Sequence, residues 1–157
     1  MTHAELVSLL EQYRAGLETE IALLRQLEAV AARQREVTEA RDYERFRTES
    51  DQRDRLTSTL VAIDQELRPI RETLHENRQA LSALPDYKVA GELRRTAADL
   101  VQRILKTDRD SMKALSDADL ARKAVVASLE RGETTLAAYR KVIAPPLSSA
   151  TLLNRRG

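Results

Sequence analysis

The chain has no cysteine and no tryptophan, and only one of its 157 residues is phenylalanine. Without cysteine it forms neither disulfides nor thiolate metal sites, which suits a reducing cytosol. Aromatic residues make up only 3% of the sequence, whereas deep globular cores use more of them because aromatic side chains bury the most area. The core is therefore expected to be thin, lying between long helices and built from leucine, isoleucine, valine and alanine.

Turn-forming residues are also scarce, with four glycines and four prolines. An all-β or α/β fold needs many more turns, so both classes are excluded. No apolar run approaches the ~18 residues that a membrane span requires. The first residues lack the basic-then-apolar pattern of a signal peptide. A cytoplasmic protein with no direct membrane insertion is predicted.

The charges balance and alternate along the chain, with 26 basic and 25 acidic residues and no basic block. Nucleic-acid binding is therefore not expected. No phosphate loop, zinc spacing or convergent catalytic set occurs, so neither an enzyme nor a cofactor or metal site is predicted. Glu72 and His75 have the Glu-x-x-His spacing of di-iron bundles. The second copy that such a site needs is missing, and His75 is expected to be an ordinary solvated histidine.

The first helix is predicted over residues 3–38. Thr2 and Glu5 have the spacing of a capping box at its start. The apolar pattern thins after residue 33 and changes register. This favours a short break with Asp42 as the next N-cap, while one continuous bent helix is the alternative. The apolar positions recur at helical steps: Leu6, Leu10, Tyr13, Leu17, Leu24, Leu27 and Ala31.

The second helix is predicted over residues 42–84 and has the most regular heptads in the chain. Asn77 occupies a core slot, where it is expected to set register at some loss of stability. Pro69 is expected to kink the helix, because it removes one backbone hydrogen bond. The slots alternate in steps of three and four: Arg53, Leu56, Leu60, Ile63, Leu67, Ile70, Leu74, Asn77, Leu81 and Leu84.

The third helix is predicted to be the longest, over residues 87–143, after Pro85 ends the second. Eleven residues separate its apolar positions Ile104 and Leu115, which predicts a locally unwound supercoil. Gly132 occupies a later core slot, where it marks either a close approach between helices or a joint at which the last turns can swing.

These patterns predict an all-α fold: an elongated antiparallel helical hairpin or three-helix, coiled-coil-like bundle with a long C-terminal helix. Residues 1–144 are expected to form one domain, and residues 145–157 a flexible tail. Helices of unequal length cannot fully bury one another, so the end of the third helix is expected to project and bind a partner helix. Self-association into a homodimer is the alternative. The predicted partner-binding residues are Val125, Leu129, Leu136, Tyr139, Ile143, Leu147, Leu152 and Leu153.

Three features of the chain occur together: an opening helix rich in Leu and Glu, a charged junction before a helix with regular leucines, and a closing segment that ends in prolines and a short tail. They lie in residues 6–31, 41–64 and 129–157. In these features the chain resembles the FlgN-type flagellar export chaperones.

The resemblance implies a small cytosolic chaperone without a cofactor. Such a chaperone holds the helical C-terminal segment of a hook-associated protein and delivers it to the export gate for type III secretion. It also implies that a tyrosine near the C-terminus acts at the gate, for which Tyr139 is the nearest match. A homo-oligomeric structural coiled-coil scaffold or adaptor, based on the regular heptads, is the second hypothesis.

Overall fold

The computed structural model describes the backbone of residues 1–116 and 120–143, and their side chains except those of residues 120–122. The described residues form helices and no strand. Four of the helices are long and one is a single turn: α1 (His3–Glu39), α2 (Tyr43–Glu76), α3 (Arg78–Leu81), α4 (Pro85–Ala114) and α5 (Leu120–Ile143).

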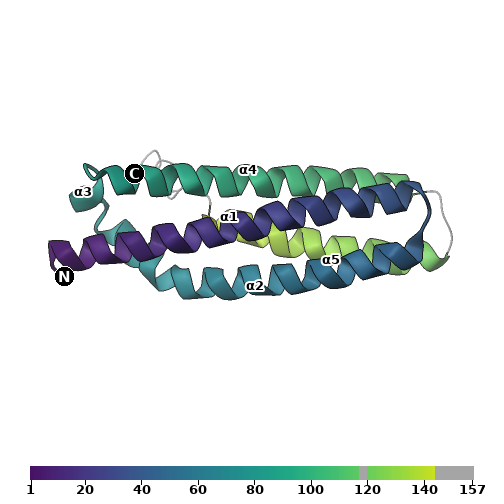
Figure 1. Ribbon diagram of the computed structural model, residues 1–157, viewed down its shortest axis with the longest axis horizontal. Helices are drawn as coiled ribbons and strands as arrows, with labels where there is room; N and C mark the ends of the chain where they lie inside the picture. Colours follow the sequence, from purple (N-terminus) through teal and green to yellow (C-terminus); the bar gives the residue numbers. More distant parts are fainter. Residues whose placement is uncertain (117–119, 144–157) are drawn as a thin grey trace, which may run out of the picture.

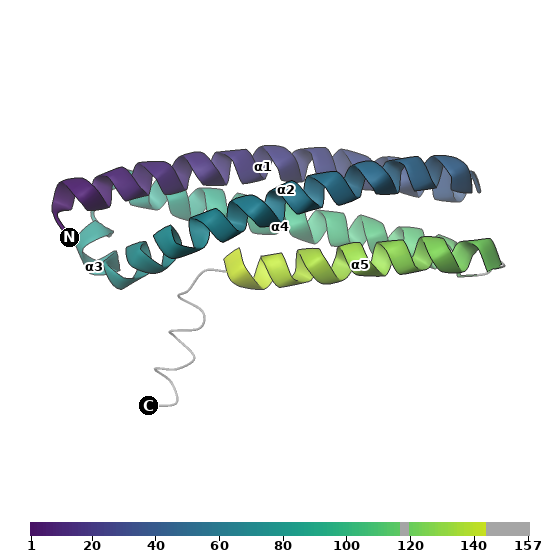
Figure 2. The same ribbon diagram turned by 90° about the horizontal axis from the view of Figure 1, so that it is seen from below.

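The long helices lie side by side along one axis, as Figures 1 and 2 show, and α3 lies at the end where the chain begins. The chain forms two helical hairpins, α1 with α2 and α4 with α5. Helix α1 packs against α2 and α4, and α5 packs against the same two helices. The predicted all-α, elongated antiparallel bundle is therefore confirmed, with one more long helix than the three expected.

Both ends of α1 follow the sequence-based predictions. The Glu5 backbone N–H donates to the Thr2 hydroxyl, and the Thr2 N–H donates to the Glu5 carboxylate, which completes the capping box. The break after α1 is also confirmed, and the continuous bent helix is wrong. Arg41 has a φ of 58°, in the left-handed region that ends a helix. The Asp42 side chain then caps α2 by accepting from the backbone N–H of Arg45.

The second helix ends at Glu76, earlier than the predicted residue 84. Asn77 does not occupy a core slot that sets register. It is the C-cap of α2, and its side-chain amide donates to the Thr73 carbonyl at 2.8 Å. Asparagine competes for backbone hydrogen bonds in this way, which explains why the helix stops there. The single turn α3 follows. Pro69 lies inside α2, and the helix continues through it.

The predicted helix over residues 87–143 is two helices. Helix α4 ends at Ala114, and α5 begins at Leu120 and runs back along the bundle. Leu115 is buried beside Val37, Phe46 and Leu129, so a hydrophobic cluster closes the bundle where the chain reverses. Ser116 donates to the Lys113 carbonyl, the kind of local bond that competes with continued helix.

Three clusters of buried apolar side chains follow one another along the axis. The two that we call the closed half include α5 residues such as Leu136 and Leu129. The third cluster, which we call the open half, includes no residue of α5. It is built by α1, α2, α3 and α4 from Leu6, Leu10, Tyr13, Leu17, Leu67, Leu74, Leu81 and Ala90.

Candidate functional site

The exposed apolar stripe predicted at the end of the third helix is not present. Because α5 folds back onto α2 and α4, its apolar side chains are buried in the closed half. These are Val125, Leu129, Leu136, Tyr139 and Ile143. The other predicted partner-binding residues, Leu147, Leu152 and Leu153, lie outside the described residues. Partner binding by either group stays a prediction.

The described surface carries little apolar area overall. Among the large hydrophobic side chains described, only Met1 and Val142 are exposed. Scattered exposure of this kind is ordinary for a protein surface. Among the described residues the expected surplus of apolar surface is therefore wrong, and a candidate site depends on cavity shape and polarity instead.

The closed half contains a buried ion pair between α2 and α4. The Arg53 guanidinium donates to both carboxylate oxygens of Asp108, at 2.6 and 2.5 Å, and the two side chains are only 3% and 1% exposed. Arg53 also donates to the Gln34 side chain at 2.8 Å, and Gln34 donates to the Ser50 hydroxyl at 3.0 Å. The paired charges balance, as a buried guanidinium and carboxylate require.

Helix α5 approaches this ion pair at Gly132. A Cβ atom at this position would lie 3.0 Å from Nε of Arg53 and 3.3 Å from its central carbon. Of the two interpretations of Gly132, the close approach between helices is confirmed. The absence of a side chain lets the α5 backbone cover the guanidinium.

A second buried polar contact joins α5 to α1. The Tyr139 hydroxyl donates to Oε2 of Glu20 in a short hydrogen bond, and both residues are buried. The pKa of the Glu20 carboxyl is raised to about 7, mainly by burial; the Tyr139 hydrogen bond opposes this shift, and the charge of nearby Asp64 adds to it. Burial also raises the pKa of Tyr139 well above its ordinary value. Near neutral pH, Glu20 is therefore present in both its protonated and its ionised form.

Polar side chains continue past the end of α5 into the open half. On α2, Arg71 donates to Asp64 at 3.0 Å in a pair that is almost buried. The Arg71 charge lowers the pKa of the nearby Tyr13, although burial dominates and the pKa is raised overall. The Tyr13 hydroxyl is buried beside the Arg71 guanidinium, which acts on its pKa both as a charge and as a hydrogen-bond donor, although the contact lacks good hydrogen-bond geometry.

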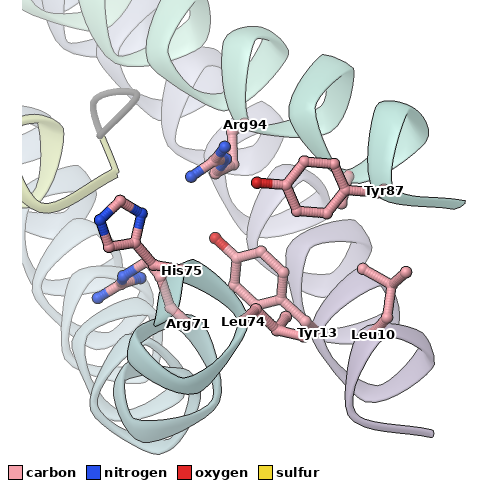
Figure 3. A pocket seen from close by; sticks show the side chains of 8 residues that line it. Leu10, Tyr13, Arg71, Leu74, His75, Tyr87 and Arg94 are labelled. Carbon is pink, nitrogen blue, oxygen red and sulfur yellow. The ribbon is translucent and has the colours of Figure 1, made fainter. Parts of the chain in front are cut away.

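The Tyr13 hydroxyl points into a small cavity in the open half, as Figure 3 shows. The cavity has a volume of about 20 Å³, which is room for about one oxygen-sized group. Leu10, Leu74 and Ala90 make it apolar on one side. Its polar lining comes from α1, α2 and α4: Tyr13, Arg71, His75, Tyr87 and Arg94.

Arg94 is the charged group of this cavity that has no counter-ion. Its Nε is buried without a hydrogen-bond partner, and no carboxylate in the described part of the chain forms an ion pair with it. Its charge lowers the pKa of Tyr13, which places the two groups close together. His75 and Tyr87, which flank them, are half-buried. The cavity therefore offers several donors and an unbalanced positive charge.

The sequence-based interpretation missed this cavity. Tyr13 was expected to pack in the core, which is confirmed, but its hydroxyl lies in the cavity. His75 was expected to be solvated and is half-buried there. The available signal was a set of basic residues, Arg71 and Arg94, among core slots of two helices.

No family model, no characterised protein and no solved structure matches this chain. The resemblance to the FlgN-type chaperones therefore stays a prediction. Among the helices that the structure describes, none has both the length and the apolar character needed to cross a bilayer.

Proposed function

We propose that the chain is an export chaperone that binds the helical C-terminal segment of a flagellar hook-associated protein and delivers it to the type III export gate. The observation that carries the proposal is the uneven length of the bundle. Helix α5 lies between α2 and α4 in the closed half, whereas Leu74 of α2 and Leu81 of α3 help to close the core of the open half.

The part of the bundle beyond α5 has the length of a short helix. Helix α2 runs about ten residues beyond Leu67, and α4 runs a similar length from Pro85 to Arg94. At 1.5 Å per residue this is about 15 Å, or roughly three helical turns. The core below it is closed, with Leu10 and Tyr13 only 1% and 3% exposed. A partner helix would therefore contact half-buried side chains such as His75 and Tyr87 at the cavity.

The homo-oligomeric scaffold has less support. It was based on the heptads of α2, whose apolar positions pack inside the chain: Leu60, Leu67 and Leu74 are buried against α1, α4 or α5. A helix that has satisfied its stripe internally has little left for a coiled-coil partner. Light scattering that gives the same monomeric mass at low and high concentration would rule out the scaffold.

The absence of cysteine allows a direct test. In a His75→Cys variant the new thiol is the only one in the chain and lies at the cavity. In a Ser58→Cys variant it lies on the exposed face of the same helix. Purified C-terminal segments of hook-associated proteins are added, and alkylation by iodoacetamide is followed by mass spectrometry. We expect at least about tenfold slower alkylation for His75→Cys at saturation, which corresponds to about 1.4 kcal/mol of protection.

The control thiol at position 58 should react at the same rate with and without the segment. If no hook-associated segment binds, the proposed function is wrong. If a segment binds but protects neither thiol, it binds elsewhere, and the surface around the cavity is not the site.

A further inference from the structure

The small cavity of the open half presents hydrogen-bond donors without an acceptor. Figure 3 shows the Tyr13 and Tyr87 hydroxyls and the Arg94 guanidinium pointing toward one another at this cavity. Tyr13 is only 3% exposed, and its hydroxyl forms no hydrogen bond of good geometry within the described residues. The buried Nε of Arg94 has no partner there either. Buried donors are normally paired, so this grouping indicates a ligand that accepts hydrogen bonds.

The contact between Arg71 and Tyr13 leaves the Tyr13 proton free. A guanidinium only donates hydrogen bonds, so Arg71 acts on a lone pair of the Tyr13 oxygen. The Tyr13 O–H group therefore remains available as a donor to a ligand in the cavity into which the hydroxyl points.

The positive charge at the cavity is in excess. Arg71 has Asp64 as its counter-ion at 3.0 Å, so the charges of this pair cancel. Glu20, the other acidic group that acts on Tyr13, is only partly ionised near neutral pH because its pKa is raised to about 7. Arg94 has no carboxylate partner in the described part of the chain. A partly buried charge without a counter-ion favours an anion over a neutral water molecule in the cavity.

The volume of the cavity decides which anion fits. At about 20 Å³ it exceeds the roughly 10–15 Å³ that a water molecule needs, and it admits one somewhat larger atom. A carboxylate or a phosphate has several heavy atoms and is too large, whereas a halide ion is a single atom.

We propose that the cavity binds a chloride ion, which accepts hydrogen bonds from the Tyr13 hydroxyl and from the Arg94 guanidinium. Half-buried Tyr87 and His75 also line the cavity and can donate to the ion. Because these residues lie on α1, α2 and α4, the ion links three helices where α5 is absent. It therefore stabilises the open half from within.

The test compares the melting temperature of the full chain in chloride and in gluconate at equal ionic strength. We expect it to be at least about 3 °C higher in ~150 mM chloride, as a site with a dissociation constant about ten times lower predicts. Binding is also followed directly through the broadening of the chloride NMR signal. Bromide, a single atom, should reverse the broadening, and acetate should not.

Two arginine variants assign the effect to the cavity. Arg94→Gln should abolish both the broadening and the rise in melting temperature, whereas Arg95→Gln, which changes the exposed neighbour on the same helix, should keep both. The general effect of a salt on protein surfaces is shared by the two variants, so their difference reports the site.

Tyr13→Phe removes one donor to the ion. The chloride concentration that gives half of the NMR broadening should rise at least about threefold, as the loss of one hydrogen bond predicts. A role of Tyr13 in packing alone would lower the melting temperature equally in both salts and leave this concentration unchanged.

Three outcomes overturn the proposal. Equal melting temperatures in chloride and gluconate, with no NMR broadening, would mean that the cavity holds water only. A chloride effect that persists in Arg94→Gln would place the ion elsewhere on the chain. Displacement of chloride by acetate would indicate a site open to larger anions. None of these measurements uses a hook-associated segment, so the chloride site and the proposed function are tested separately.

Discussion

The closed and open halves of the bundle both contain arginine in the interior, and they treat its charge differently. In the closed half, Arg53 pairs with Asp108 and is covered by the α5 backbone at Gly132. In the open half, Arg71 pairs with Asp64, but Arg94 has no carboxylate partner among the described residues. A buried guanidinium needs a counter-charge. The comparison teaches that the arginine charge of the closed half is balanced within the chain, whereas in the open half Arg94 lies at a small cavity without a carboxylate partner among the described residues.

The largest effect is expected from Asp108→Ala in the closed half. Removing the carboxylate leaves Arg53 buried without a counter-charge, which costs about 3–5 kcal/mol in the free energy of unfolding. Urea denaturation followed by circular dichroism measures the change. Asp110→Ala, on the exposed neighbour that lies 4.0 Å from Arg35, should change stability by less than about 0.5 kcal/mol.

The paired replacement Arg53→Met with Asp108→Leu sharpens this prediction. It removes both charges together and should recover most of the stability lost by Asp108→Ala. If Asp108→Ala itself is nearly neutral, the closed half does not depend on its ion pair and the contrast between the two halves is wrong.

An intermediate effect is expected at Glu20, where the two halves meet. Its pKa is about 7 in the folded chain against an ordinary value of 4.5, so between these pH values the folded state holds a proton that the unfolded state releases. Stability from this group is therefore present below about pH 4.5 and is lost as pH rises to about 7. Glu20→Gln keeps an acceptor for Tyr139 and cannot ionise. It should be more stable than the wild type by about 1–3 kcal/mol at pH 8.

The measurement is the free energy of unfolding of both proteins from pH 4 to pH 8. The difference in the free energy of unfolding between Glu20→Gln and the wild type should be small at pH 4 and should grow between pH 4.5 and about pH 7. Glu11→Gln, on the exposed face of α1, is the control, and its difference from the wild type should not grow with pH. A constant difference at all pH values would contradict the raised pKa.

The smallest effect concerns how tightly the open half is packed. A Cβ on Gly91 meets nothing within 4 Å, whereas a Cβ on Gly16 would lie 2.4 Å from Leu67. Gly91→Ala should raise the free energy of unfolding by up to about 1 kcal/mol through helix propensity. Gly16→Ala has the same propensity gain, but buried Leu67 has to move, so its stability should be lower than that of Gly91→Ala by about 1 kcal/mol or more.

Thermal or urea denaturation of the two variants checks this prediction. Equal stabilisation by both substitutions would mean that the seam between α1 and α2 has room to spare, and that the open half is looser than its packing indicates.

Much of the fold follows from the periodicity of the sequence, because helix class and the ends of α1 depend on local patterns and caps. The reversal of the chain between α4 and α5 does not follow from periodicity, because periodicity indicates which face of a helix is buried and carries no information about where the chain turns back. The locally unwound supercoil predicted from the eleven-residue interval between Ile104 and Leu115 is wrong. Asp108 and Ser111 are buried and continue the core slots in steps of four, three and four.

The same is true of α1, where polar residues continue the apolar series. Glu20, Gln34 and Thr38 are buried at the positions that the three-four alternation assigns to the core. When only apolar residues are counted, the buried stripe of α1 ends too early, and the buried polar contacts of this helix are not predicted. The cavity at Tyr13 and Arg94 could not be predicted in this way, because it depends on three helices meeting and on α5 ending where it does.

The division into two hairpins has a consequence for the order of assembly. Within each hairpin the paired helices are neighbours in the chain, so each can form by closing a short loop. The cavity of the open half is different, because its lining comes from α1 and α2 in the first hairpin and α4 in the second. It exists only after the hairpins have docked. A ligand that binds there is therefore bound by the docked state alone, and it should raise the melting temperature in proportion to the logarithm of its concentration.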